Sequence, residues 1–590
     1  MSLSQTTPTV AKKSKRTHFT TDPYTGEEPR DSECTPFGNG PFQLLVLLIT
    51  TVAGGVLFIQ YTLFGLSSRE MDHWCRRPKE FAHMSVGAWK QFAIPRSANG
   101  SYSRCTVRDP PDGGLSARVV ACTAWEFNLS EYGNTVVSEW SLVCHRAYLS
   151  DVASFVNSAA MILSLPVAGA AADHIGRKTV SFVALTALLL TLVTSSLAVD
   201  LQTFIVTRAI AAATSTSLVS LFVVLYEVTT PDRRLAYCTV ALALATVFGE
   251  VYLFFVEYFK VGWSMSQLLI AALGPALLAT YFTLEESPAW LLAKQNIDEA
   301  DRVVRDVARF NGKPSKECST LLRTHLKKSR LPGEEGDLAS VFPTPRWRRF
   351  LLIAFVWLVV GWTYSHYTTG FGKLVSRPVS VGTTLLLVPM FMLVWPLLKG
   401  GRRVTPAVRT SLLVFSASSA LLFALTDREA PLVHTVLHVT MRLSIHLPTA
   451  FLFYITISLY PTRMRCMVVS TCFAFGVFSD KAGHAAFSLV LQKREDVALG
   501  ITAVMTSLAA VAACYLPSHI SGVTITAGRL FSTTWPSISG FVQPDRYLVE
   551  SLVSLPKGPV RSAIYKRRSR VNLMPEAFRA RLFRPFRHRN

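Results

Sequence analysis

Charged residues are scarce in this chain of 590 residues. They make up 17% of it, whereas hydrophobic residues make up 50%. Soluble proteins carry about a quarter charged residues, so this composition excludes an ordinary soluble protein of several domains. Residues 152–172 and 179–199 contain no charged side chain. Because about 20 apolar residues cross the hydrocarbon core of a bilayer as a helix, the chain is predicted to be embedded in a membrane.

Recognised catalytic motifs are also missing. The sequence has no Gly-x-Ser-x-Gly, Walker phosphate loop, His-Glu-x-x-His or Cys-x-x-Cys, and so shows no nucleophile motif, phosphate cradle or metal cage. We therefore predict a protein that is not an enzyme and uses no cofactor or metal. His434, His438 and His446 have a spacing that fits a metal site, but residues 434–459 hold no cysteine or carboxylate. The wall of a water-filled cavity is the preferred interpretation.

Acidic residues are the scarcer charged class. The chain has 60 Lys and Arg against 38 Asp and Glu, a formal net charge of +22. The basic residues are dispersed among turns and a tail, without a nucleic-acid-binding motif, so we expect no nucleic-acid partner. The basic tail, residues 518–590, would be attracted to anionic lipids of the inner leaflet, although such a run of like charge is more often disordered.

Residues 1–41 lack the apolar core of a cleavable signal peptide. This segment is therefore expected to stay in the cytoplasm, with the span Phe42–Leu66 leading to an extracellular loop, residues 67–149. The loop contains glycosylation acceptors at Asn99 and Asn128. It also contains four cysteines that are expected to form two disulfides of open connectivity: Cys75, Cys105, Cys122 and Cys144.

Twelve membrane spans are predicted in all, with both termini in the cytoplasm. Short inner turns contain ten Lys or Arg against two acids, the asymmetry that the positive-inside rule demands. The spans after the first are predicted at residues 152–172, 179–199, 201–226, 235–255, 263–282, 350–370, 379–398, 406–425, 434–459, 467–490 and 497–516.

An internal repeat divides the spans into two halves of six. Gly176-Arg177-Lys178 recurs as Gly401-Arg402-Arg403, so residues 42–284 and 349–517 are predicted to be equivalent halves around a central site. Between them, residues 285–348 form a polar cytoplasmic loop. There, Asn296 is predicted to cap a helix whose apolar face holds Ile297, Ala300, Val303, Val304 and Val307.

Several motifs resemble a known transporter family. Gly169-x-x-x-Asp173-x-x-Gly176-Arg177-Lys178 resembles the loop between helices 2 and 3 of the major facilitator superfamily. The segments Trp140–Cys144, Glu286–Leu291 and Leu459–Arg465 resemble the organic cation and anion transporters of that superfamily. The resemblance implies an all-α membrane protein that works by alternating access. It also implies a set of gating residues: Gly169, Asp173, Gly176, Arg177, Lys178, Glu227, Arg233, Arg234, Glu286, Arg402, Arg403 and Arg465.

Charged residues inside the predicted spans are candidates for function, because an unpaired ion there is costly. From their similar depths, Arg208 is predicted to pair with Glu250, and Arg442 with Asp480, which is adjacent to Lys481. Structural clamps that never touch substrate are the alternative. The other residues predicted to line the cavity are Tyr226, Trp357, Trp362, Tyr364, His438, His446, Tyr454 and Val477.

The charge of the substrate stays open. The resembled family typically has Asp in cation transporters and Arg in anion transporters where this chain has Val477. We expect a small organic ion (cation, anion or zwitterion), transport across the plasma membrane, and a monomer or weak homo-oligomer. The alternatives are a transporter of sugars or other neutral solutes, and a receptor-like relative that does not transport.

Overall fold

The computed structural model describes residues 37–69, 71–96, 100–111, 117–328, 344–366, 377–398, 404–425, 430–489 and 494–516. Several predictions lie outside these residues. They concern the first 36 residues, the basic tail, and three predicted site residues: Asn99, Arg402 and Arg403.

Helices dominate the described residues. By length and composition, ten helical segments could cross a membrane. They are formed by α1 (Pro41–Ser67), α4 (Tyr148–Ile175), α5 (Arg177–Ser196), α6 (Leu201–Ser215) with η5 (Thr216–Leu218) and α7 (Val219–Val228), α8 (Arg234–Tyr258), α9 (Trp263–Ala271) with α10 (Gly274–Ala279) and η6 (Thr280–Phe282), α14 (Thr344–His366), α17 (Val404–Ala424), α18 (Pro431–Leu459) and α20 (Glu495–Ala513).

Two further segments complete the predicted twelve. One consists of α15 (Arg377–Leu385) and α16 (Leu387–Leu398), which share a shorter apolar stretch. The other is α19 (Arg465–Leu489), which carries Asp480 and Lys481 within its length. The order of the spans therefore agrees with the twelve-helix prediction.

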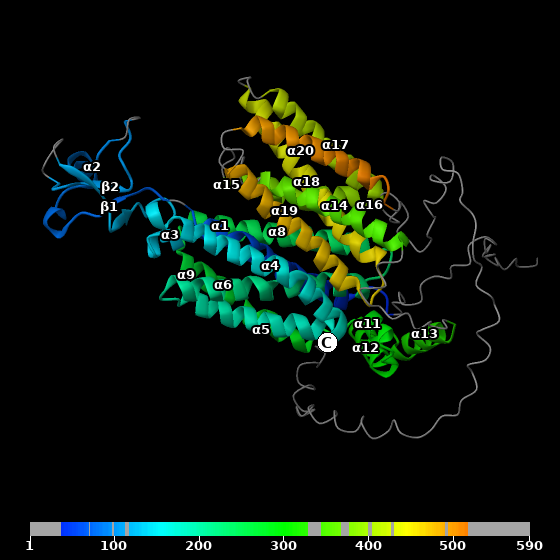
Figure 1. The fold of residues 1–590 in the computed structure, drawn as a ribbon. Helices are drawn as coiled ribbons and strands as arrows, with labels where there is room; N and C mark the ends of the chain where they lie inside the picture. The colour runs from blue at the N-terminus through cyan, green and yellow to red at the C-terminus, as the bar shows by residue number, and fades with distance from the viewer. Residues whose placement is uncertain are drawn as a thin grey trace, which may run out of the picture. The chain divides into compact units, whose positions relative to one another are not determined.

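The two groups of six helices meet along α4 and α19, which lie side by side in Figure 1. Gly169 on α4 permits this approach, because a Cβ atom there would come within 2.6 Å of the Cys466 carbonyl oxygen. One large apolar core lies among the first six spans. A second core joins the last six spans to residues of α4 and α7, such as Leu165 and Val223.

The loop after α1 is a small domain, residues 71–143, called the loop domain below. It has two antiparallel strand pairs, β1 (His73–Cys75) with β4 (Trp125–Phe127) and β2 (Thr106–Asp109) with β3 (Arg118–Ala121). Disulfides join Cys75 to Cys122 and Cys105 to Cys144. The short helices of this region are η2 (Lys79–Phe81), α2 (Val86–Ala93), α3 (Val136–Glu139) and, just after the domain, η4 (Cys144–Arg146).

Three helices follow the sixth span: α11 (Pro288–Ala293), α12 (Ile297–Phe310) and α13 (Ser315–Lys328). Asn296 occupies the N-cap position of α12, but its side chain makes no capping hydrogen bond. Ala300, Val303, Val304 and Val307 are buried as predicted, whereas Ile297 is 45% exposed. Ile297 is the first residue of α12, and its side chain is not buried with the other four.

Candidate functional site

A buried charge network lies where the turn at Gly176 joins α4 to α5; we call this end of the bundle the turn end. Gly176 has φ +127°, and a Cβ there would come within 2.6 Å of Glu286 Oε2. The tight turn directs Arg177 inward, where its side chain is fully buried. Its guanidinium lies 3.1 Å from Asp173 Oδ1 and 3.3 Å from Glu227 Oε1.

The same network connects the two halves. Asp173 accepts hydrogen bonds from the backbone N–H groups of Cys466 (3.3 Å) and Met467 (2.9 Å) at the start of α19. Arg177 donates to the Thr462 carbonyl oxygen at 2.5 Å, and Arg465 lies 2.9 Å from Glu227. A carboxylate at a helix N-terminus also interacts favourably with the helix dipole. These contacts hold the two halves together at the turn end.

Glu286 and Trp290 support the turn from the segment after the sixth span. Glu286 accepts hydrogen bonds from the backbone N–H groups of Arg177 (3.2 Å) and Lys178 (3.1 Å). Burial raises the pKa of Glu286, and the hydrogen bond from the Ser287 N–H opposes that rise. The Trp290 indole donates to the Asp173 carbonyl oxygen at 2.8 Å.

Three basic residues of the predicted gating set lie beside aromatic rings, whereas a fourth, Arg233, is exposed. Arg234 and Arg465 both lie against the Tyr226 ring, with guanidinium carbons 4.5 and 5.1 Å from its centroid. The Lys178 ammonium lies 4.4 Å from the Tyr281 ring centroid. Arg233 differs, because its side chain is 55% exposed and 3.9 Å from Asp232. Arg233 is therefore not part of the buried network.

A second polar layer lies deeper between the halves. Arg442 Nη2 on α18 lies 3.2 Å from Glu250 Oε1 on α8 and donates to Thr384 Oγ1 at 2.7 Å. The predicted pair of Arg208 with Glu250 is therefore wrong. Counting residues predicts how deep Arg208 and Glu250 lie along their helices, but it does not predict the rotation of each helix. In the structure, the rotation of α8 turns Glu250 toward the second half.

Asp480 has different partners from those predicted. It accepts a hydrogen bond from the Tyr61 hydroxyl on α1 and lies 2.9 Å from Lys481 Nζ. The Lys481 ammonium is 4.2 Å from the Tyr61 ring centroid. The predicted pair of Arg442 with Asp480 is wrong, because a cation adjacent in sequence already neutralises Asp480.

The first span contributes two residues that sequence reasoning missed. Tyr61 contacts Asp480, and Gln60 Oε1 accepts a hydrogen bond from Arg208 Nη1 at 2.7 Å. Thr384 on α15 was missed as well. The consecutive polar residues Gln60 and Tyr61 interrupt the apolar run 42–66, and that interruption was the available signal.

Comparisons with known proteins agree with this arrangement. Residues 112–398 match the family model described as "Sugar (and other) transporter". The xylose symporter XylE, in a double-tryptophan variant, has the same fold, with a TM-score of 0.57 at 12% identity over 81% of this chain and 96% of that chain. Another XylE structure, described as a major facilitator superfamily proton:xylose symporter, gives a TM-score of 0.53 at 11% identity over 80% of this chain and 94% of that chain.

The chain thus has the fold of the XylE structures, and residues 112–398 match a transporter family model. It is similar to solute carrier family 22 member 7 of Rattus norvegicus, with 26% identity over 72% of this chain and 84% of the relative. It is also similar to a beta-alanine transporter of Drosophila melanogaster, with 27% identity over 55% of this chain. That match spans 60% of the Drosophila relative's length.

The other aromatic and histidine residues predicted to line the cavity contact one another or a neighbouring helix. Tyr364 lies beside His446, with 2.9 Å between its hydroxyl and Nδ1, and the Tyr226 and Tyr454 rings are 5.9 Å apart across the halves. Trp362 donates to Thr502 on α20 at 3.2 Å, and His438 is buried.

Four of the predicted cavity residues belong to one packed core: Tyr226, Trp357, Tyr454 and Val477. Trp357 is 2% exposed, donates to Thr456 and meets the Phe453 ring edge-on at 4.9 Å. Val477 is likewise 2% exposed within that core. Trp357 and Val477 thus pack inside the second half in this structure, and their place in the cavity wall stays a prediction.

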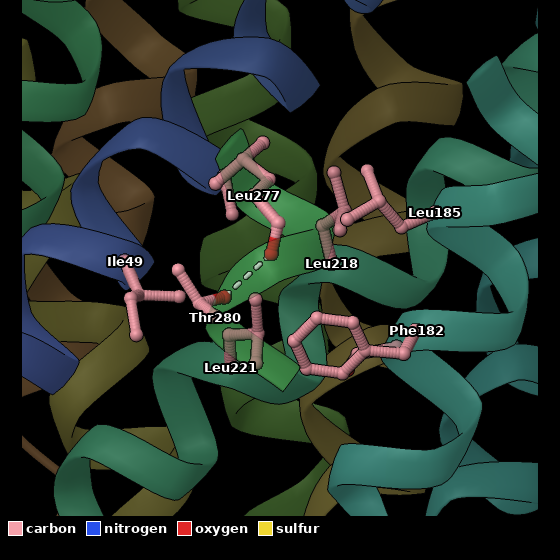
Figure 2. Close-up of a pocket in the computed structure, with 9 residues that line it drawn as sticks. Ile49, Phe182, Leu185, Leu218, Leu221, Leu277 and Thr280 are labelled. Carbon is pink, nitrogen blue, oxygen red and sulfur yellow. Dashed lines mark hydrogen bonds between the residues drawn. The ribbon is translucent and has the colours of Figure 1, made fainter. Parts of the chain in front are cut away.

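A separate hollow between α1, α5 and α10 is apolar (Figure 2). Ile49, Phe182, Leu185 and Leu277 line it, and the Thr280 hydroxyl is already bonded to the Leu277 carbonyl oxygen at 2.6 Å. The lining offers no charged group, so this hollow does not have the chemistry of an ion-binding site.

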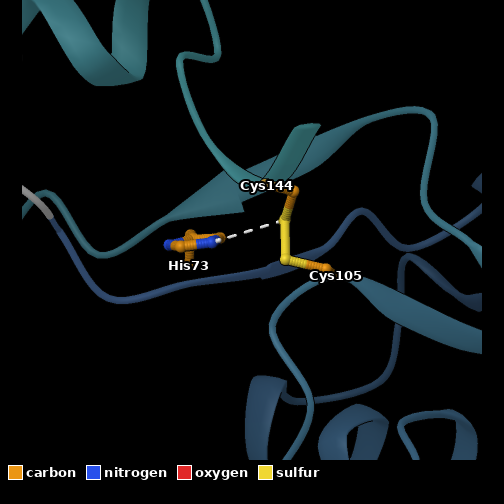
Figure 3. Close-up of side chains that lie close together, drawn as sticks. All are labelled: His73, Cys105 and Cys144. Atoms are coloured by element: carbon orange, nitrogen blue, oxygen red, sulfur yellow. Dashed lines mark hydrogen bonds between the residues drawn. A yellow bond between two sulfur atoms is a disulfide. The ribbon is translucent and has the colours of Figure 1, made fainter. Parts of the chain in front are cut away.

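A cluster in the loop domain contains three atoms of types that can bind metals (Figure 3). Ligand atoms of His73, Cys105 and Cys144 lie within 4.8 Å of one another, with His73 Nε2 3.9 Å from Cys144 Sγ. The two sulfur atoms are joined in a disulfide. Only the imidazole is then available as a ligand, which is too few for a metal centre. Nearby, Asn128 is half-buried, and its Oδ1 accepts hydrogen bonds from the Ser130 N–H at 3.2 Å and the Ser130 hydroxyl at 2.6 Å.

Proposed function

We propose that this transporter carries small organic ions across the plasma membrane by alternating access. The observation that carries the proposal is the ion pair between Arg442 and Glu250. Their side chains are 3% and 13% exposed, and they come from opposite halves of the molecule. Transporters of this fold bind substrates near the midplane between their halves. Charges of both signs at that place suit an ionic substrate better than a neutral sugar.

The pair suggests how a substrate could enter the site. A zwitterion would present its carboxylate to Arg442 and its ammonium to Glu250, replacing the contact between the two side chains. Asp480 and Lys481 form a second pair of opposite charges among the described residues. The Drosophila relative's name, a beta-alanine transporter, fits this proposal, because beta-alanine carries one carboxylate and one ammonium group.

The proposed topology places the turn end in the cytoplasm. Both termini, residues 1–41 and 518–590, and the central segment 285–348 would then also be cytoplasmic, with the loop domain outside. In this orientation the structure corresponds to a state closed toward the cytoplasm, because the Asp173, Arg177 and Glu227 contacts join the halves there. Opening to the cytoplasm requires these contacts to break. The protein is proposed to act as a monomer or weak homo-oligomer.

Uptake by cells that express the full chain tests this proposal. Labelled organic cations, organic anions, zwitterions and sugars would be compared, with surface biotinylation to correct for delivery. We expect uptake of at least one ionic class and a loss of about tenfold or more for Glu250→Gln and for Arg442→Gln, since each leaves a buried charge unpaired. Arg409→Gln, which changes an exposed arginine, is the matched control.

The charge swap decides whether the pair itself matters. The double variant Glu250→Arg with Arg442→Glu should recover part of the uptake that either single variant loses. Normal uptake by both single variants would refute a role for the pair in transport. Uptake of sugars alone would favour the neutral-solute alternative, and no uptake despite normal surface delivery would favour a receptor-like protein.

A further inference from the structure

Arg208 is a buried cation whose neighbouring groups do not neutralise it. It is 2% exposed on α6, and its Nη1 donates to Gln60 Oε1 on α1 at 2.7 Å. Among the residues that the structure describes, no carboxylate forms an ion pair with Arg208. Glu250, the acid at similar depth, instead pairs with Arg442.

Two hydrogen-bond donors at this contact have no partner. They are Arg208 Nη2 and Gln60 Nε2, and both are shielded from solvent. Gln60 itself is fully buried. Since Nη1 and Oε1 are already bonded to each other, the covalent geometry of the two side chains keeps the unpartnered nitrogens close to this hydrogen bond. The contact therefore presents positive charge and N–H groups without an acceptor.

Aromatic side chains cover this contact toward the loop domain. Phe64 lies one helical turn beyond Gln60, and Phe204 lies one turn before Arg208. Their rings stack at 6.4 Å, and Trp263 meets Phe204 edge-on at 5.3 Å. Each of these three residues is at most 7% exposed. Bulk water is thus kept away on this side, and a desolvated cation costs several kcal/mol unless an anion accompanies it.

We propose that Arg208 and Gln60 bind a chloride ion inside the first half. The ion would accept N–H groups from Arg208 Nη2 and Gln60 Nε2, which satisfies both unpartnered donors and neutralises the guanidinium. A water molecule would accept both hydrogen bonds, but it would not neutralise the guanidinium, and its own two hydrogens would need acceptors. The aromatic cover favours a single atom over a larger organic anion. This site is formed by α1 and α6, apart from the Glu250 and Arg442 pair on α8 and α18.

The proposal can be tested without any transport measurement. Full-length protein purified in detergent would be unfolded thermally in potassium chloride, bromide, gluconate or acetate of equal ionic strength. A ligand that binds only the folded state raises the unfolding temperature with concentration. We therefore expect chloride and bromide to raise it in a saturable manner relative to gluconate. Equal stability in chloride and gluconate would overturn the proposal, and acetate acting as strongly as chloride would overturn its assignment to a monoatomic ion.

Variants identify the residues that hold the ion. Arg208→Gln should abolish the chloride response, whereas Arg442→Gln, which changes another buried arginine, should retain it. Gln60→Leu keeps the cation, so it should raise the chloride concentration needed for half of the effect by about tenfold, which corresponds to about 1.4 kcal/mol. This second variant keeps the test decisive if Arg208→Gln does not fold. An unchanged chloride response in Gln60→Leu or in folded Arg208→Gln would refute the site, even if organic-ion uptake is established.

Discussion

Glu227 is the residue on which the contacts at the turn end converge. Its Oε1 accepts from Arg177 and Arg465, at 3.3 and 2.9 Å, and its Oε2 accepts from the Ser287 hydroxyl. Arg177 belongs to the first half and Arg465 to the second, so one acid holds cations from both halves.

The first prediction concerns Asp173→Asn and Arg177→Ala. Each change should lower uptake by about tenfold or more without preventing delivery to the surface, because removing one partner of a buried ion pair costs about 3–5 kcal/mol. The loss would weaken closure at the turn end. Uptake per surface molecule is the measurement, and Arg233→Ala is the control because Arg233 is exposed in a neighbouring turn. Normal uptake by either variant would mean that the motif acts only as a topological signal.

At the scale of elements, α12 and α13 are joined through one acid. The Asp301 side chain is 2% exposed; it accepts from the Ser319 hydroxyl and lies 2.8 Å from Arg323 Nη2. Burial acts to raise the pKa of Asp301, but the hydrogen bonds from Ser319 and Arg323 outweigh it and lower the pKa. The charged form is thus favoured when the two helices are packed.

The second prediction follows from the sign of that shift. A carboxyl group with a lowered folded-state pKa contributes stability above its unfolded pKa of about 4, and this contribution is lost as pH falls through the folded pKa. Asp301→Asn should therefore loosen α12 against α13 at pH 7. The difference from the unmodified protein should shrink as the pH falls below about 4.

Limited proteolysis of α12 and α13 in the purified full chain would measure this effect between pH 7 and pH 3. Asp298→Asn is the matched control, because Asp298 is an exposed acid of the same helix. An equal cleavage rate for Asp301→Asn and the unmodified protein at pH 7 would contradict the assigned role of Asp301.

The elements also show what the sequence could predict. Asp173 ends α4 and Arg177 begins α5, four residues apart across the Gly176 turn, so their approach was predictable from the sequence. Glu250 and Asp480 were predicted at suitable depths but with the wrong partners. Depth depends on counting residues, whereas the choice of partner depends on how each helix is rotated by packing. Trp357 shows a similar limit, since a pattern of aromatic residues does not distinguish a cavity wall from a core.

At the scale of the whole molecule, the loop domain is covalently tied to the membrane bundle. The disulfide between Cys105 and Cys144 connects the segment before β2 to η4, which directly precedes α4, and the far end of α4 carries Asp173. Phe64 on α1 and Trp263 on α9 share a core with Val136 of the loop domain. This packing fixes the loop domain to the end of the bundle opposite the turn end. Which side of the membrane holds that domain therefore determines the orientation of the entire transporter.

The last prediction tests this orientation. A glycan at Asn128 and two disulfides require that the loop domain lies outside, because the cytoplasm supports neither modification. We expect a glycosidase to increase the gel mobility of the full-length chain, with the Asn128 contribution lost in Asn128→Gln and Ser130→Ala and kept in Ser130→Thr. Cys105→Ala with Cys144→Ala should leave Cys75 and Cys122 protected from thiol alkylation. Unchanged mobility after glycosidase, together with four alkylated loop cysteines, would place the loop domain in the cytoplasm and the Asp173–Arg177 network outside, reversing the proposed direction of closure.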